Sequence, residues 1–233
     1  MNSSRLPGKA VADLCGEPLL ARLLQRLSGS RELDQLVLAT TLLPADDRLG
    51  ALAAAHGIAW VRGSEDDVLD RMYQAACQYH ADIVVRLTAD NPLVDGALVD
   101  LAVSSLVGGN RDYAAVSVKG GFPLGISVEV CRMAALQTAW QQAIEPCMRE
   151  HVTPFIHTQP ERFSVEWLVS DTDYSSLRVT VDTPEDLALI RCVFAHFGRN
   201  DFAWEAAARV CLARPEWTRL NQHIQQKSVD RVA

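Results

Sequence analysis

The segment Ile83-Val84-Val85-Arg86-Leu87-Thr88-Ala89-Asp90 joins an apolar run to a carboxylate. The apolar part predicts a strand of a mostly parallel sheet, and the aspartate follows just beyond the end of that strand. Ligands of open α/β sheets bind beyond the carboxyl ends of the strands. Asp90 is therefore predicted to face a ligand site, although an aspartate shortly before Pro92 also suits a simple turn.

The residues before this segment alternate between strand and helix patterns. Apolar runs at 36–40 and 58–61 predict two further strands, the first of them buried and parallel. Leucines at helical spacing predict a helix at 18–27, and a second helix is predicted at 46–56. This alternation predicts βαβ units and a mostly parallel, doubly wound, Rossmann-like α/β sheet in a single domain spanning the whole chain.

The second half of the chain has a less regular pattern. Its predicted elements are strands at 114–118 and 126–130, helices at about 132–144 and 148–158, a late strand at 177–181, a helix ending near 196, and two helices within 204–226.

The composition limits the classes of function. With 48% hydrophobic and 22% charged residues, the 233-residue chain is an ordinary soluble globular protein. The net charge of −7 argues against general nucleic-acid binding, yet a local basic cluster could still hold a nucleotide. No apolar run has the length of a membrane span, and no signal-peptide pattern opens the chain. Six scattered cysteines without a Cys-x-x-Cys pair indicate reduced, mostly buried thiols, so we expect a cytoplasmic protein. A dinucleotide-binding enzyme is disfavoured because no Gly-x-Gly-x-x-Gly follows a predicted strand.

A cationic, donor-rich loop, Ser-Ser-Arg-Leu-Pro-Gly-Lys, stands near the start of the sequence. Ser3 and Ser4 offer hydroxyl donors, and Gly8 allows close approach of the backbone to a ligand. Arg5 and Lys9 add a planar and a point-like positive charge. These are the properties of a polyphosphate site ahead of a helix. The alternative is an ordinary polar N-terminal tail.

A second carboxylate follows the late predicted strand. Asp182 stands directly after the apolar run 177–181 and just before a proline-containing helix start with acidic residues in its first turn. Helix capping alone explains this pattern well. The position after a strand also makes Asp182, like Asp90, a candidate ligand-site residue.

Three motifs together resemble the sugar-acid cytidylyltransferases, which make CMP-activated acidic sugars such as CMP-Kdo and CMP-sialic acid. They are Arg-Leu-Pro-Gly-Lys at 5–9, Gly-Ser-Glu-Asp-Asp-Val-Leu-Asp-Arg at 63–71 and Val-Asp-Thr-Pro-Glu-Asp-Leu at 181–187. The branch most similar to this sequence is the spore-coat polysaccharide biosynthesis protein F group. The resemblance runs from Ser3 to about residue 225. It implies a nucleotide-diphospho-sugar transferase fold with an inserted, β-rich sugar-side segment at about 112–160.

The resemblance also implies a reaction, in which a sugar or sugar acid receives CMP from CTP and pyrophosphate is released, as a step in surface polysaccharide biosynthesis. The implied nucleotide-binding residues are Ser3, Ser4, Arg5, Gly8, Lys9, Ser64, Arg86 and Asp90. Asp90 and Asp182 are the implied Mg²⁺ ligands, and with Arg5 and Lys9 they form the implied catalytic set.

On the sugar side, the motifs Pro-x-Gly-x-x-Val-Glu-Val and Arg-Glu-His-Val-Thr-Pro resemble the same family. The implied substrate-binding residues are Glu129, Arg149, Glu150 and His151. Polarity of a surface helix explains Glu150 and His151 equally well. Ser127 stands where the family usually has aspartate, and Ala89 where it has glycine. These departures favour an alternative, a nucleotide-sugar-binding protein that kept the fold and lost catalysis.

Two expectations concern the assembly and the sheet. We expect a homodimer, because the superfamily commonly pairs through the inserted segment and the apolar stretch 113–140 could need a partner to cover it. Related chains begin with an apolar strand that runs into the phosphate loop, so we also expect the active protein to start upstream of Met1. That strand would lie between the strands at 36–40 and 83–87, whose facing edges are otherwise unpaired.

Overall fold

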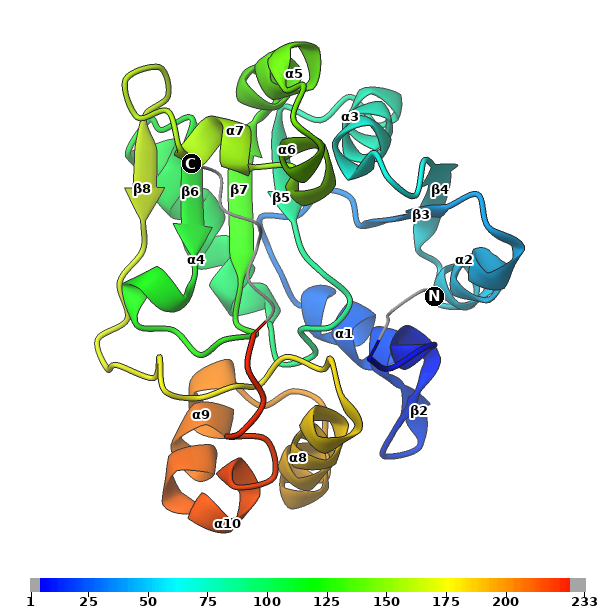
Figure 1. Ribbon diagram of the computed structural model, residues 1–233, viewed down its shortest axis with the longest axis vertical. Coiled ribbons are helices and arrows are strands. Elements are labelled where there is room, and N and C mark those ends of the chain that lie inside the picture. The colour runs from blue at the N-terminus through cyan, green and yellow to red at the C-terminus, as the bar shows by residue number, and fades with distance from the viewer. Residues whose placement is uncertain (1–4, 227–233) are drawn as a thin grey trace.

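The computed structural model describes residues 5–226 and shows a mixed α/β fold (Figure 1). The strands are β1 (Asp13–Leu14), β2 (Glu17–Pro18), β3 (Val37–Thr41), β4 (Ala59–Gly63), β5 (Ile83–Arg86), β6 (Tyr113–Val116), β7 (Val128–Arg132) and β8 (Val165–Trp167). The α-helices are α1 (Leu19–Leu27), α2 (Asp47–Ala55), α3 (Val68–Gln78), α4 (Gly96–Gly108), α5 (Met133–Gln142), α6 (Pro146–His151), α7 (Pro154–His157), α8 (Pro184–Phe197), α9 (Trp204–Ala213) and α10 (Pro215–Thr218). Short 3-10 helices are η1 (Lys9–Val11), η2 (Pro44–Asp46) and η3 (Val118–Gly120).

The main sheet has the strand order β5-β7-β6-β8. β7 is antiparallel to both of its neighbours, while β6 and β8 are parallel, so β5, β6 and β8 all run in one direction. β3 and β4 form a separate parallel pair. Apart from the short β1–β2 hairpin, β7 is the reversed strand of an otherwise parallel arrangement. The predicted mostly parallel α/β fold is confirmed.

A cavity of about 560 Å³ lies between β3 and β5. Within residues 5–226, β3 pairs only with β4 and β5 pairs only with β7, so each strand turns an unpaired edge away from its partner. Both strands line the cavity, together with α3 and α4. Figure 1 shows the β3–β4 pair standing apart from the main sheet. The unpaired edges expected from the sequence are therefore present in the described chain.

This cavity changes the burial of the strand predicted at 36–40. That strand forms and is parallel to its neighbour, but only Thr40 of β3 is buried and the other β3 residues are half-exposed. The prediction of a buried strand was wrong, because a strand is fully buried only when both its edges and both its faces are covered.

β6 shows how well the rest of the sheet is covered. Its residues alternate between two apolar clusters, with Ala114 and Val116 on one face and Tyr113 and Ala115 on the other. All four are completely buried within one chain. The apolar surface that was expected to require a partner at 113–140 is thus largely covered by the protein's own helices, and homodimerisation stays a prediction from the resemblance.

Two element predictions need correction, and one short strand was missed. The late strand 177–181 is extended but is no strand of the sheet, because its amides donate to loop carbonyls such as that of Leu124. The helix predicted at 148–158 is two short helices, since Val152 adopts a positive φ of 73° and Pro154 starts the second. β8 was not predicted; with only three residues it leaves no clear pattern in the sequence.

The cysteines are only partly as expected. All six are free thiols, but Cys131 and Cys211 alone are buried. The prediction of mostly buried thiols was therefore wrong. Within residues 5–226, no helix is both long and apolar enough to cross a membrane.

Candidate active site

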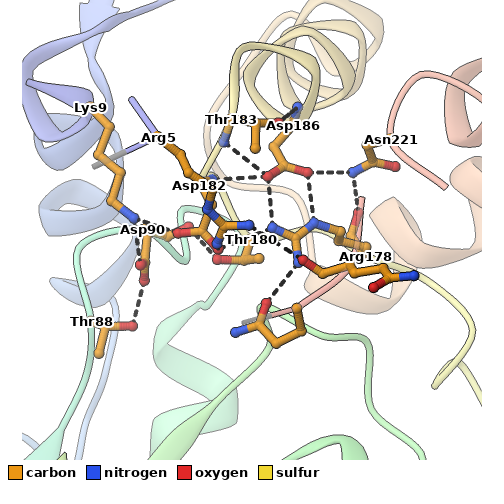
Figure 2. Close-up of polar contacts among 12 residues, drawn as sticks. Arg5, Lys9, Thr88, Asp90, Arg178, Thr180, Asp182, Thr183, Asp186 and Asn221 are labelled. Carbon is orange, nitrogen blue, oxygen red and sulfur yellow. Dashed lines mark hydrogen bonds and ion pairs between the residues drawn. The ribbon is translucent and has the colours of Figure 1, made fainter. Parts of the chain in front are cut away.

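Three segments that are far apart in sequence meet at the candidate site: the N-terminal loop, the turn after β5 and the extended segment before α8 (Figure 2). A backbone hydrogen bond joins the last two, because the amide of Val181 donates to the carbonyl of Asp90 at 2.8 Å. That bond places Asp182 beside the turn that carries Asp90. Gly8, in a left-handed conformation with φ of 73°, turns the N-terminal loop into η1 so that Lys9 follows directly.

Lys9 lies between the two aspartates. Its Nζ is 2.7 Å from Oδ2 of Asp90 and 2.8 Å from Oδ1 of Asp182. The Lys9 side chain is only 17% exposed. Burial acts to lower the pKa of this amine, but the two carboxylates outweigh it and hold the pKa above its ordinary value. Asp90 and Asp182 thus share one cationic group.

Two arginines bind the other oxygen of Asp182. Arg5 donates to Oδ2 at 2.9 Å and Arg178 donates to the same oxygen at 3.0 Å. Burial acts to raise the pKa of Asp182, but Lys9, Arg5 and Arg178 together lower it below its ordinary value. Asp182 is therefore ionised and contacts three cations at neutral pH.

The Thr88 side chain orients Asp90. Its Oγ1 donates to Oδ1 of Asp90 at 2.6 Å and itself accepts a hydrogen bond from Nδ2 of Asn91 at 3.0 Å. The amide of Asn91 also donates to the carbonyl of Thr88, which closes a tight turn. The turn interpretation of Asp90 is confirmed, and the turn directs the carboxylate at Lys9, while a ligand-binding role for Asp90 stays a prediction.

Asp186 fixes the position of Arg178, the arginine that contacts Asp182. Its carboxylate accepts two hydrogen bonds from Arg178, each of 2.8 Å, and another of 2.8 Å from Asn221. It also accepts from the amide of Thr183, whose hydroxyl accepts from the amide of Asp186 to complete a capping box. Asp186 is fully buried. The helix-capping prediction for this motif is correct, and the cap also fixes the arginine that holds Asp182.

Sequence reasoning missed Arg178 and Asn221. Arg178 had a usable signal, since it is the one charged residue within the apolar run 177–181. Asn221 had none, because it lies in the tail and reaches Asp186 only through tertiary folding.

The donor set at this site fits a divalent cation. Two carboxylates from separate segments already converge on one positive charge. No group of three or more His, Cys, Asp or Glu side chains that could hold a metal occurs in the described residues. Mg²⁺ commonly takes one or two carboxylates and completes its shell with phosphate oxygens and water, so a pair of aspartates suffices.

A second polar cluster surrounds Glu129 on β7. Arg86, at the end of β5, is the cross-strand partner of Glu129 and forms an ion pair with it. The hydroxyl of Tyr113 donates to Oε1 at 2.8 Å, and the hydroxyl of Thr153 donates to the same oxygen. Burial acts to raise the pKa of Glu129, but Arg86 and the two hydroxyls lower it below its ordinary value. This cluster brings together the predicted Arg86 and Glu129.

The remaining predicted residues lie elsewhere. Ser64 accepts a hydrogen bond from the amide of Asp67 at the start of α3. Arg149 makes a bidentate contact with Asp67 and also donates to backbone carbonyls, so much of its hydrogen-bonding capacity is already used. Glu150 is exposed and His151 is half-buried on α6. Ser3 and Ser4 lie outside the described residues.

Comparison with known proteins identifies the family and agrees with the fold. A family model described as "Cytidylyltransferase" matches residues 1–198. An uncharacterised protein of Methanocaldococcus jannaschii is 37% identical over 97% of this chain and 93% of its own length. The spore coat polysaccharide biosynthesis protein SpsF of Bacillus subtilis is 34% identical over 86% of this chain and 85% of its own.

Solved structures give the same result. A cytidylyltransferase from Leptospira borgpetersenii superposes with a TM-score of 0.91 at 29% identity, covering 97% of this chain and 95% of that one. CMP:2-keto-3-deoxy-manno-octonic acid synthetase, solved in complex with CTP, superposes with a TM-score of 0.66 at 17% identity, covering 84% and 95%. A Mycobacterium tuberculosis protein solved with manganese has a TM-score of 0.55 at 17% identity, covering 79% and 91%. The last two likenesses concern the fold alone.

An α/β fold with two carboxylates and several cations gathered beyond the end of β5 defines a candidate phosphate-handling enzyme. The chain belongs to the cytidylyltransferase family.

Proposed function

We propose that this protein transfers CMP from CTP to a hydroxyl of a sugar or sugar acid. In this reaction a bond forms between the sugar oxygen and the α-phosphorus, the bond from that phosphorus to the bridging oxygen breaks, and pyrophosphate leaves with its electron pair. The hydroxyl proton passes to solvent or to a nearby base. The observation that carries the proposal is the meeting of Arg5, Lys9, Asp90 and Asp182 from three separate segments.

The cations have the chemistry that a polyphosphate needs. Arg5 and Lys9 would bind the β- and γ-phosphates, and the charge that develops on the leaving pyrophosphate would be stabilised by the same groups. Gly8 and the predicted Ser3 and Ser4 would add close backbone and hydroxyl donors. Ser64 is proposed to border the nucleoside and Arg86 to lie near the phosphates.

Asp90 and Asp182 are proposed to hold a divalent cation, which the resemblance assigns as Mg²⁺. When bound, such a cation neutralises phosphate charge and helps to activate the attacking hydroxyl. The manganese complex of the distant M. tuberculosis neighbour is compatible with a divalent ion in this fold. The chain's own contribution is to orient the two carboxylates through Thr88 and Arg178.

The sugar is proposed to bind on the Glu129 side. Glu129 already accepts hydrogen bonds from three side chains, which leaves it little capacity for a direct contact. We therefore assign Glu129 to positioning, because its ion pair fixes Arg86, whose remaining guanidinium donors would face the phosphates. Direct roles for Arg149, Glu150 and His151 remain predictions from the resemblance, as do a cytoplasmic location, a homodimer and a role in surface polysaccharide synthesis.

The test is release of pyrophosphate from CTP with Mg²⁺ or Mn²⁺ and a panel of acidic and neutral sugars. We expect turnover with at least one sugar acid and much slower release when ATP, GTP or UTP replaces CTP. CTP binding by calorimetry, combined with no turnover on any sugar, would instead support the alternative that Ser127 and Ala89 favour, a binding protein that lost catalysis.

A further inference from the structure

The structure contains a cation that already occupies the space between the two proposed metal ligands. We propose that Lys9 is a built-in counter-ion that holds this position while the site is empty, so that a divalent metal enters only when a nucleotide's phosphates draw Lys9 away. The inference rests on the proposed function for the identity of the phosphate ligand. Its geometric basis is independent of that function.

The geometry leaves one place for a bridging cation. The oxygens that face each other are Oδ2 of Asp90 and Oδ1 of Asp182, and Nζ of Lys9 contacts both (Figure 2). The outer oxygens have other partners: Oδ1 of Asp90 accepts from Thr88, and Oδ2 of Asp182 accepts from two arginines. A divalent cation held by both aspartates would therefore compete with Lys9 for the oxygens that Lys9 now contacts.

The charges of the cluster are balanced without a metal. Asp90, Asp182 and Asp186 contribute three negative charges, and Arg5, Lys9 and Arg178 contribute three positive ones. A divalent ion added to this neutral, half-buried cluster would be repelled by the ammonium group at short range. A polyphosphate removes this repulsion, because its anionic oxygens offer the flexible Lys9 side chain new partners. When Lys9 moves to the phosphates, Oδ2 of Asp90 and Oδ1 of Asp182 become available to a metal.

This exchange predicts that substituting Lys9 raises the affinity for a divalent metal instead of lowering it. Removing a ligand or damaging the fold weakens metal binding, whereas removing Lys9 should strengthen it in the absence of nucleotide. Lys9→Met keeps a long apolar side chain without the charge. It should bind Mn²⁺ about tenfold more tightly than the wild type, since a competing internal state lowers apparent affinity in proportion to its population. The same variant should bind CTP more weakly.

The experiment is a titration of nucleotide-free protein with Mn²⁺, followed by the electron paramagnetic resonance signal of the free ion. Lys9→Gln should shift the affinity in the same direction as Lys9→Met, which guards against a folding defect in one variant. Lys9→Arg keeps a positive charge at this position, so its Mn²⁺ affinity should stay as weak as that of the wild type. Lys119→Met, which removes the lysine whose Nζ lies over the Trp167 ring, is the matched control and should behave as wild type. Adding Asp90→Asn to Lys9→Met should abolish the gain.

Mn²⁺ affinity in Lys9→Met and Lys9→Gln that is equal to or weaker than that of the wild type would overturn the inference. So would an equal gain in Lys9→Arg or Lys119→Met. The titration contains no CTP and no sugar, so its result does not depend on whether cytidylyl transfer is the reaction. If transfer is observed and the Mn²⁺ affinity does not rise, this inference alone fails.

Discussion

The two edges of β5 are built differently. On one edge, β5 pairs residue by residue with β7, and Arg86 faces Glu129 across the strands. On the other edge lies the cavity of about 560 Å³, with β3 on its far side. Backbone hydrogen bonds thus organise the Glu129 side of the molecule, while the proposed nucleotide side lacks a continuous sheet between β5 and β3 in the described residues.

Ion pairs tie together the segments on the nucleotide side. Lys9 joins the N-terminal loop to Asp90 after β5 and to Asp182 before α8, and Arg178 connects Asp182 to Asp186. These three segments therefore meet through side-chain ion pairs and one backbone hydrogen bond, from Val181 to Asp90, and not through paired strands. Such a site is more sensitive to the loss of one charge than a site built on paired strands, because each carboxylate has several partners.

The largest effect is expected for Asp182→Asn. The amide keeps the size of the side chain but removes the charge that three cations contact, and it replaces a proposed metal ligand. We expect CTP-dependent pyrophosphate release to fall by about 10²–10³-fold, with little change in the circular dichroism spectrum. Asp173→Asn, at an exposed position, is the control and should retain wild-type turnover. Turnover within a few-fold of wild type in Asp182→Asn would exclude a direct role for this carboxylate.

The next effect concerns stability. Asp186→Ala leaves the buried guanidinium of Arg178 without its principal partner, which should lower the free energy of unfolding by about 3–5 kcal/mol. Urea denaturation of the wild type and of Asp186→Ala measures this difference in the free energy of unfolding. Glu185→Ala, which removes an exposed acid from the same helical turn, should cost far less.

The pH dependence sharpens this prediction. The pKa of Asp186 in the folded protein lies below its ordinary value of 3.8, because Arg178 and Asn221 outweigh the effect of burial. A carboxyl group whose pKa is lowered by folding stabilises the folded protein fully at pH values above its ordinary pKa. This stabilisation is lost as the pH falls through the pKa of the folded state. The difference in unfolding free energy between wild type and Asp186→Ala should therefore shrink as the pH falls below 3.8. A difference that grows on acidification would contradict the assignment.

The smallest effect is expected in amide hydrogen exchange. Within residues 5–226, the amides of β3 and β5 that face the cavity have no strand partner, whereas β6 is paired with β7 and with β8. We expect the unpaired amides to exchange at least about tenfold faster than those of β6. Equally slow exchange in β3, β5 and β6 of the present chain would contradict the open edge.

Local sequence patterns predicted much of the fold because they reflect local physics. Apolar runs bounded by turns identified β3, β4 and β5, and leucine spacing identified α1. The pattern failed at 177–181, where an apolar run is extended but bonds to the loop at Leu124. Hydrophobicity reports that a segment is buried, and it does not report which backbone its amides will meet.

In the candidate site, too, local patterns indicated some features and left others undetected. Arg5, Lys9, Asp90 and Asp182 could be singled out before folding, from the loop, from strand-like runs and from the family motifs, and the structure brings all four together. The contacts of Lys9 with both aspartates, and of Arg178 and Asn221 with Asp186, could be seen only in the folded chain. The physical reason is distance along the chain: contacts between residues 9, 90 and 182 depend on how strands, turns and helix ends pack, and no local pattern encodes that packing.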